Sequence, residues 1–364
     1  MTTHRFATSL LLAAAAVFTF SSCSTEDHED ILGNWKWDNG STPAPDPEPE
    51  PDPEPTEANP KVVAQGWENV TSEFGELPEH INVYKKTTTS DGASAIAYIA
   101  VADMSKATFD VASDLAKDES GNFTCKSLYT PSEFYEANDK PAIVINGGLF
   151  FESEGLYYSQ SALYRNGEML SSNQTYWTLW DGNFWYPTLG FFFQDKDGNY
   201  QAKWSYYSWT GNDYLYDEPR QCDPEKPEQD LGSPSPSSVV LNDGQMVKVG
   251  IGGVGVLVHD GVPVNTWQYE MMDVSGGSNQ PRTAIGYSKA DNRLVFFVCE
   301  GRGMTEGVAG MTIDEVSVQM SAIGCTEALC LDGGGSSCML VNGKETIKGS
   351  DGTQRKVIDA CLLK

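Results

Sequence analysis

Tight-turn dipeptides recur along this chain and constrain its fold more than any other feature. Asp-Gly or Asn-Gly pairs begin at residues 91, 166, 181, 197, 243, 260 and 342. Several of them separate apolar or alternating runs, which is the pattern of β-hairpins, because these residues tolerate the left-handed backbone of short turns. Apolar runs at 95–101, 142–145, 254–258 and 294–298 have the character of strands. The sequence therefore predicts a strand-rich fold.

Two segments carry helix start signals instead. Thr130-Pro131-Ser132-Glu133 is a capping box with proline at the first helical position. Thr312-Ile313-Asp314-Glu315 is a second capping box, followed by apolar residues at helical spacing as far as Gly324. With strands in excess and only a few helices, we predict an α+β domain built on a mixed sheet.

The first 60 residues have the composition of a targeting segment and a spacer. The apolar run from Phe6 to Phe20 indicates a signal peptide over residues 1–22. Ser21-Ser22-Cys23 resembles a bacterial lipoprotein cleavage site, so we expect lipid at Cys23. Residues 23–60 are acidic and rich in proline, as in an extended tether. These features predict a membrane anchor in the bacterial cell envelope, with the outer membrane as the favoured location and surface exposure as a further option.

The chain is strongly acidic. It has 51 acidic and 24 basic residues and a formal net charge of −27. Residues 24–60 hold eleven of the acids and one lysine, so the remaining part is acidic as well. This charge excludes nucleic acid as a partner, because it repels a phosphate backbone. An anionic substrate needs a local pocket of arginines and backbone N–H groups.

We expect residues 61–364 to form one domain with an insertion at about residues 173–235. The insertion holds Trp177, Trp180, Trp185, Trp204 and Trp209. Such rings can stack on the apolar face of a sugar, but aromatic residues more often pack in cores and cross-strand pairs, and both interpretations stay open. At 195–199 the sequence favours a hairpin turn over a calcium loop, since its glycine does not fit the EF-hand pattern.

Histidine and cysteine are too scattered to indicate a metal site or a catalytic triad. After residue 23 the histidines are His28, His80 and His259, and no Gly-x-Ser-x-Gly motif occurs. This pattern argues against a histidine zinc site and a Ser-His-Asp triad. The seven cysteines after Cys23 form no Cys-x-x-Cys pair, and most lie in apolar runs, where a free cysteine packs as a small core residue.

Polar residues beside glycines recur where predicted strands end or begin. The segments are Asn146-Gly147-Gly148, Arg282, Glu300-Gly301-Arg302 and Asp332-Gly333-Gly334-Gly335-Ser336-Ser337. Each has a structural interpretation by itself, such as a turn, an ion pair or a solvated strand end. Four of them together favour one polar rim that carries two carboxylates, two guanidinium groups and an amide.

These residue types suit a sugar phosphate. A guanidinium group offers a rigid fork of donors to phosphate oxygens, and glycine-rich backbone offers further N–H groups to an anion. Two carboxylates can divide acid, base and nucleophile work at a glycosidic bond. Three successive glycines are costly to order, so the 333–335 loop forms either a tight structural turn or a close approach to a ligand.

The order of these motifs resembles the phosphodiester glycosidase family. The resemblance rests on Pro281–Gly286, Glu300–Arg302, Gly310–Glu315 and Leu331–Ser337, with Asn146–Phe150 as an earlier motif, and it spans about residues 95–363. This chain has Glu300 where the family often has Asp, Leu149 where an aromatic residue is common, and Cys338 where Thr is common.

The resemblance implies hydrolysis of a sugar-1-phosphodiester. The predicted location in the bacterial envelope favours a cell-wall or capsular phosphoglycan as the substrate. Asp332 and Glu300 would share the catalysis. Arg282, Arg302, Asn146, Gly147, Gly148 and the Gly333–Ser337 loop would bind sugar or phosphate. No cofactor and no metal site are predicted, although calcium or magnesium is compatible with the residues. Two alternatives stay open: a surface glycan-binding lipoprotein without turnover, and a metal-assisted phosphodiesterase with Asp332, Glu300 and Asn146 as oxygen ligands.

Overall fold

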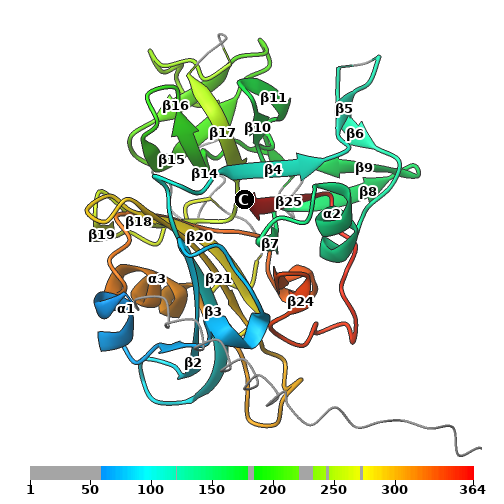
Figure 1. The fold of residues 1–364 in the computed structure, drawn as a ribbon. Coiled ribbons are helices and arrows are strands. Elements are labelled where there is room, and N and C mark those ends of the chain that lie inside the picture. Colours follow the sequence, from blue (N-terminus) through cyan, green and yellow to red (C-terminus); the bar gives the residue numbers. More distant parts are fainter. Residues whose placement is uncertain (1–58, 120, 179–183, 221–232, 243–245, 271–273) are drawn as a thin grey trace, which may run out of the picture. The chain divides into compact units, whose positions relative to one another are not determined.

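The computed structural model divides the chain into two units, Met1–Pro53 and Glu54–Lys364. It describes residues 59–364 apart from 120, 179–183, 221–232, 243–245 and 271–273 (Figure 1). The predicted signal peptide, Cys23 and nearly all of the tether lie outside the described residues. Within the described part, no helix has the length and apolar content needed to cross a membrane.

An eight-stranded antiparallel sheet is the largest element of the second unit. Its order is β1 (Glu68–Asn69), β2 (Ile81–Thr88), β3 (Ser94–Asp103), β21 (Arg293–Cys299), β20 (Arg282–Ser288), β22 (Glu327–Cys330), β18 (Val256–His259) and β19 (Val262–Pro263). The central strands are buried on both faces. On β21, for example, Leu294 and Phe296 belong to one core cluster and Val295 and Phe297 to another. This explains why the strands appear as continuous apolar runs.

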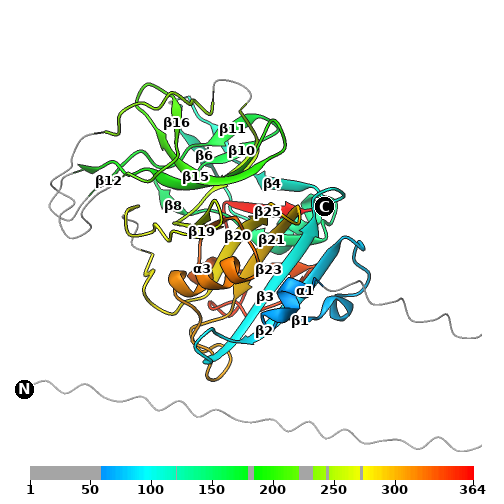
Figure 2. The ribbon, with the colours of Figure 1, turned by 90° about the vertical axis from the view of Figure 1, so that its left-hand side faces the viewer.

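Helices cover one of those faces (Figures 1 and 2). Helix α3 (Ile313–Ala322) packs Ile313, Val316 and Met320 against the sheet, and α1 (Pro60–Ala64) adds Val62. Thr312 caps α3 by accepting from the Glu315 backbone N–H, as predicted. The Glu315 carboxylate does not close the predicted box, because it accepts instead from the backbone and hydroxyl of Ser90.

The other face packs against three smaller layers. A five-stranded sheet has the order β24 (Lys344–Glu345), β23 (Met339–Val341), β7 (Ile143–Asn146), β25 (Asp359–Leu363) and β4 (Phe109–Ser113). A four-stranded sheet has the order β5 (Ala116–Lys117), β6 (Phe123–Cys125), β9 (Leu156–Ser159) and β8 (Phe150–Ser153). Helix α2 (Pro131–Ala137) covers the five-stranded sheet and begins with the complete predicted capping box at Thr130.

The third layer is a six-stranded sheet with the order β11 (Glu168–Ser171), β10 (Leu163–Arg165), β17 (Val247–Gly252), β14 (Leu189–Asp195), β15 (Tyr200–Tyr207) and β16 (Asp213–Tyr216). Its strands β14, β15 and β16 come from the aromatic segment predicted as an insertion, but its other three strands lie outside residues 173–235. Trp185 and Trp204 are core residues, whereas Trp209 is 69% exposed. The short ribbon β12 (Trp177–Thr178) and β13 (Phe184–Trp185) also belongs to this segment.

The predicted α+β class and its main elements are confirmed. The runs at 95–101, 142–145, 254–258 and 294–298 correspond to β3, β7, β18 and β21, and 195–199 is the β14–β15 turn. Every strand pair of the described sheets is antiparallel. Six of the cysteines are buried free thiols, which agrees with their predicted role as core residues. Cys222 lies outside the described residues.

One buried carboxyl in the six-stranded sheet makes the fold sensitive to pH. Asp213 on β16 is fully buried, and its Oδ2 accepts a 2.7 Å hydrogen bond from the Tyr164 hydroxyl. Burial raises the pKa of Asp213 to about 6, although hydrogen bonds from Tyr164 and Ser205 act in the opposite direction. The folded protein therefore keeps this proton over a pH range in which the unfolded chain has already released it.

We predict that Asp213→Asn gains stability relative to the wild type as pH rises from 4 to 7. In that range the wild-type carboxyl must ionise in a buried position, whereas asparagine does not titrate. The difference in free energy of unfolding shifts toward the variant by roughly 1–3 kcal/mol, since each unit of pKa shift is worth about 1.4 kcal/mol. Urea unfolding at several pH values measures this shift. The exposed Asp197→Asn is the control, and a pH-independent difference for Asp213→Asn contradicts the prediction.

Candidate functional site

The glycine loop after β22 lies at a junction between two sheets. Asp332 N–H donates to Gly147 O at 3.0 Å, and the Asn146 side-chain amide donates to Asp332 O at 2.8 Å. Gly334 N–H donates to Pro281 O at 2.8 Å, and Gly334–Ser336 form a short 3₁₀ turn. The ends of β7, β20 and β22 are thereby tied together around Asp332.

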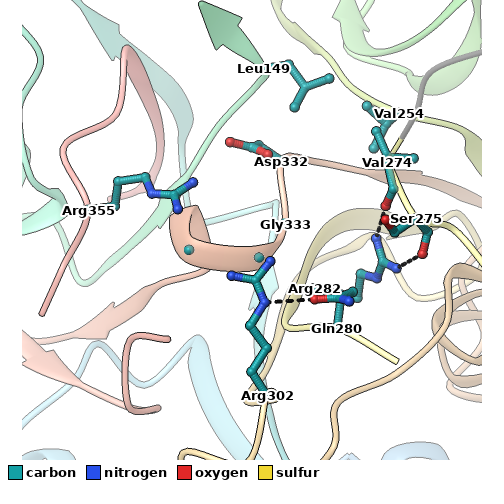
Figure 3. A pocket seen from close by; sticks show the side chains of 12 residues that line it. Leu149, Val254, Val274, Ser275, Gln280, Arg282, Arg302, Asp332, Gly333 and Arg355 are labelled. Carbon is teal, nitrogen blue, oxygen red and sulfur yellow. Dashed lines mark hydrogen bonds between the residues drawn. The ribbon is translucent and has the colours of Figure 1, made fainter. Parts of the chain in front are cut away.

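A pocket of about 250 Å³ opens beside this loop (Figure 3). Its lining consists of Leu149, Val254, Val274, Ser275, Gln280, Arg282, Arg302, Asp332, Gly333, Gly334, Gly335 and Arg355. Three arginines and one carboxylate thus share one small, polar cavity. The predicted rim is present in part, because Arg282, Arg302, Asp332 and the three glycines converge here.

Two of the three glycines lie directly against arginine head groups. A Cβ added to Gly334 would lie 2.8 Å from Arg302 Nη2, and one added to Gly335 would clash with the Arg355 guanidinium. A Cβ on Gly333 would approach Pro281 O to 2.9 Å and Arg282 Cδ to 3.6 Å. At Gly334 and Gly335 the loop lacks side chains because guanidinium groups lie directly against its backbone, whereas at Gly333 the close neighbour is the Pro281 carbonyl oxygen.

Arg302 and Arg355 present their guanidinium groups to the pocket. Arg302 is exposed and has φ +58°; its Nε donates to Gln280 Oε1 at 2.8 Å and its Nη1 to Ser350 Oγ at 3.3 Å. Both of these acceptors are neutral, so they leave the Arg302 charge uncompensated. Arg355 forms an ion pair with Asp351 at 2.7 Å and donates to Ser336 Oγ at 3.4 Å.

Arg282 has a different environment from the other two arginines. It is buried and donates to four backbone carbonyls, those of Met311, Val274, Ser275 and Ser278. Most of its donors therefore hold the 274–278 segment, which supplies two lining residues. Its positive charge still borders the pocket, and its Nη1 lies 3.7 Å from the position of a Cβ on Gly333. The geometry favours a positioning and electrostatic role for Arg282 over direct phosphate contact.

Asp332 supplies the carboxyl group of the pocket. The residue is half-buried, and its side chain lies on the side of Leu149 and Arg355 in Figure 3. Burial raises the pKa of Asp332 to about 6, although the Ser336 hydroxyl and Arg355 act in the opposite direction. A carboxyl with this pKa changes its charge near neutral pH, which suits acid, base or nucleophile chemistry.

The Asn146-Gly147-Gly148 motif lies behind the pocket and outside its lining. The Asn146 Oδ1 accepts from the Thr283 hydroxyl at 2.8 Å and from Cys338 N–H at 3.1 Å. Gly147 and Gly148 lack side chains because Asp359 and Ser161 pack against them. The motif holds the Asp332 loop in place, so substrate contact by these three residues stays a prediction.

Glu300 also lies outside the pocket lining. It is buried, and its Oε2 accepts a 3.0 Å hydrogen bond from the Lys348 backbone N–H. That bond fixes the start of the segment that carries Ser350, Asp351 and Arg355. Catalysis by Glu300 stays a prediction, and its geometry favours support of this segment. Ser336 contacts Arg355, whereas the buried Ser337 hydroxyl has no hydrogen-bond partner among the described residues.

Sequence reasoning missed two ionisable groups of the site. Arg355 follows an Asp-Gly turn rather than a predicted strand, so no strand-end pattern marked it. Asp359 begins β25 behind the pocket; its Oδ1 accepts from Gly148 N–H at 2.8 Å, and Oδ2 has no partner among the described residues. Burial, followed by the nearby Asp332 carboxyl, raises the pKa of Asp359 to about 7. Two carboxyl groups near the pocket therefore change charge in the same pH range.

The described residues do not assemble the three predicted oxygen ligands of a metal-assisted site. Asn146 Oδ1 accepts a hydrogen bond from the Thr283 hydroxyl, and Glu300 lies outside the pocket lining. Neither side chain therefore joins Asp332 in the cavity. A separate cluster of His259, Asp260 and Glu327 has ligand atoms within 4.8 Å of one another. Both Glu327 oxygens accept backbone N–H groups, from Ala202 and Asp260, which is a structural use of this carboxylate.

Solved structures provide a comparison of the fold. A hypothetical protein from Synechocystis is 15% identical, with a TM-score of 0.50, and the alignment covers 82% of this chain and 67% of that one. This likeness concerns the fold alone. The catalytic domain of zebrafish N-acetylglucosamine-1-phosphodiester alpha-N-acetylglucosaminidase, auto-inhibited by its pro-peptide, is 18% identical with a TM-score of 0.49, covering 82% of this chain and 89% of that domain.

Sequence comparison identifies the family. The SPbeta prophage-derived uncharacterized protein YomE of Bacillus subtilis (strain 168) is 37% identical over 83 residues, which is 23% of this chain and 12% of that protein. A family model described as phosphodiester glycosidase matches residues 139–364, a range that contains every residue lining the pocket. The resemblance inferred from the motifs is confirmed, and the chain belongs to the phosphodiester glycosidase family.

Proposed function

We propose that this protein hydrolyses a sugar-1-phosphodiester at the glycosidic bond, in the pocket formed by Asp332, Arg302 and Arg355. The observation that carries the proposal is the fit of the Arg302 and Arg355 guanidinium groups against one glycine loop beside the Asp332 carboxyl group. Family membership supports the reaction class. The pocket is positive in an otherwise acidic chain, which favours an anionic substrate group at this point.

The arginines suit the charge that develops during the reaction. When the bond between the anomeric carbon and the phosphate oxygen breaks, its electron pair stays on the phosphate, and a singly charged diester becomes a monoester that can carry two charges. Donors aimed at this growing charge stabilise the transition state more than the substrate. Arg302 has neutral hydrogen-bond partners, so it is best suited to contact the phosphate directly.

Asp332 is best suited to act in its ionised form, as nucleophile or as base for water at the anomeric carbon. The leaving phosphomonoester has a second pKa of about 6, so it departs at neutral pH with little need of a proton donor. Catalysis then depends more on a group that attacks the anomeric carbon, or that activates water to attack it. Water supplies the hydroxyl group that ends on the sugar, and one proton is released.

The location of the protein is part of the same proposal. The signal-like residues 1–22, Cys23 and the tether are consistent with a lipid-anchored envelope protein, for which a phosphoglycan of the cell surface is a reachable substrate. Metabolic labelling with a fatty acid, in wild type and Cys23→Ala, tests this anchor.

Hydrolysis at the glycosidic bond can be recognised with sugar 1-(4-nitrophenyl phosphate) diesters carrying different sugars. We predict release of 4-nitrophenyl phosphate, so that colour appears only after a phosphatase is added. Arg302→Ala and Arg355→Ala each lower kcat/KM by about 10²–10³-fold, the usual loss for one donor to a developing charge. Arg293→Ala, at the opposite end of β21, is the charge-matched control.

Direct release of 4-nitrophenol, abolished by a chelator and restored by magnesium or calcium, would favour the metal-assisted phosphodiesterase instead. Wild-type turnover in both arginine variants would place the reaction outside this pocket.

The ionisation of Asp332 gives a pH prediction. The pKa of this carboxyl is raised to about 6, so the active ionised form is lost as pH falls through that value. We expect kcat to rise with pH through about 6 and then level off. Asp332→Asn should lose activity roughly 10²–10⁴-fold, the range for removal of a group that moves protons in the transition state.

Glu300→Gln is the matched control, because glutamine keeps an oxygen acceptor for Lys348 N–H. Glu300→Gln should retain the wild-type pH profile of kcat, even if altered packing lowers the value of kcat itself. A rate that falls as pH rises through 6 would contradict the ionised form of Asp332 as the active one.

A further inference from the structure

A second cavity lies between the four-stranded sheet and the aromatic segment and shares no residue with the Asp332 pocket. This aromatic groove has a volume of about 530 Å³. It is lined by Gly121, Asn122, Phe123, Phe151, Tyr158, Ser159, Ser172, Asn173, Gln174, Thr175, Tyr176, Thr178, Tyr207, Ser208, Trp209 and Gly211. The lining comes from β6, β8, β9, β12, β15 and the segments beside them; Figure 2 shows β8, β12 and β15 in the same region of the domain.

The described residues that line the groove are uncharged. They include six aromatic residues together with amides, hydroxyls and glycines, but no Asp, Glu, Lys or Arg. This composition is unusual in a chain with 75 charged residues among 364. A charged ligand would be left without a partner in the groove, so the occupant must be neutral.

Exposed aromatic rings concentrate at this groove. Among the described residues, the exposed large hydrophobic side chains that are aromatic are Phe151, Phe184 and Trp209, at 42%, 46% and 69% exposure. Phe151 and Trp209 line the groove, and Phe184 packs edge-on against Tyr176, which lines it too. Apolar rings gathered on the surface beside a cavity mark a binding site, because their exposure to water costs free energy.

The rings form two preformed pairs, one stacked and one tilted. Phe151 and Tyr158 are stacked with centroids 5.2 Å apart and planes 13° apart, and Tyr176 and Trp209 lie 5.5 Å apart at 31°. The backbone beneath them is fixed by side chains. Gln174 donates to Tyr176 O and Thr175 to Tyr207 O, both at 2.8 Å. Ligand binding therefore costs little conformational entropy, because the rings are already ordered.

A neutral saccharide has the chemistry that this groove requires. A pyranose ring has apolar C–H faces that lose water favourably against a flat aromatic ring, and its hydroxyl edges match amides and hydroxyls. A single-stranded nucleic acid would also stack on rings, but its phosphates need cations that the described lining lacks. We propose that the aromatic groove binds a neutral saccharide chain, which is a separate site from the Asp332 pocket.

The two sites are joined by one short stretch of chain. Leu149 lines the Asp332 pocket and Phe151 lines the groove, so their Cα atoms are at most about 7 Å apart. The two cavities therefore border the same short stretch of chain, and in this proposal the glycan held on the rings extends its end toward the pocket. This last step rests on the proposed hydrolysis, whereas saccharide binding by the groove does not.

Calorimetric titration of the full chain with neutral hexasaccharides tests the groove. The probes are maltohexaose, cellohexaose, xylohexaose, mannohexaose and N-acetylchitohexaose. We expect at least one to bind and to shield tryptophan fluorescence from acrylamide. Trp209→Ala should weaken that binding at least tenfold, and Trp209→Phe should retain most of it. Because Trp209 is largely exposed, both variants are expected to fold, which circular dichroism checks.

Two controls separate this site from the proposed enzyme. Val318→Ala removes an exposed apolar side chain from α3 and should leave binding unchanged. Arg302→Ala should lose hydrolysis and keep saccharide binding, so failure of one proposal is distinguishable from failure of the other. Binding should also be insensitive to salt between 50 and 500 mM, since the described lining residues hold no charge.

The groove proposal is overturned if none of the five probes binds, if binding survives Trp209→Ala, or if it falls steeply with salt. It is also overturned if sedimentation shows a dimer that Trp209→Ala dissociates, because the rings then pair with a second copy of the chain.

Discussion

The contact between guanidinium groups and bare backbone at Gly334 and Gly335 is the constraint on which the candidate site depends. Any side chain at Gly334 or Gly335 would occupy the space of the Arg302 or Arg355 head group. The glycines therefore allow positive charges and the Asp332 carboxyl to share a cavity of about 250 Å³. Ordering three glycines is costly, and hydrogen bonds hold the start of the loop in place: Asn146 donates to Asp332 O, and Gly147 O accepts from Asp332 N–H.

The same arrangement explains why several polar side chains near the site form hydrogen bonds with backbone groups. Asn146, Arg282 and Glu300 use their side chains to hold backbone, and Asp359 caps Gly148. These buried groups fix the ends of strands from two sheets, so the groups that face the cavity are already oriented. Preorganisation of this kind lets charged side chains act without reorganising during a reaction. The aromatic groove is preformed in a similar way, by Gln174 and Thr175 beneath its rings.

Much of this arrangement could be predicted from local sequence, and the parts that could not depend on tertiary packing. Strand-end motifs marked Arg282, Arg302, Asp332 and the glycine loop, because alternation and turn residues are local signals. The direction in which each side chain points was not predictable from local sequence. Glu300 and Asn146 carry the right groups, but tertiary packing turns them away from the cavity. Arg355 does not follow a predicted strand, so no strand-end motif indicated it. Among the tryptophans, only contacts across strands separate buried Trp204 from exposed Trp209.

The most direct test of the account is the fate of oxygen from water during turnover. Hydrolysis of a sugar-1-phosphodiester in H₂¹⁸O, followed by mass spectrometry of both products, reports which bond breaks. Attack at the anomeric carbon in the Asp332 pocket predicts ¹⁸O in the sugar and none in the phosphomonoester, with incorporation lost in Asp332→Asn. Label in the phosphate would mean attack at phosphorus, and it would contradict the central claim that the arginines stabilise a departing phosphate.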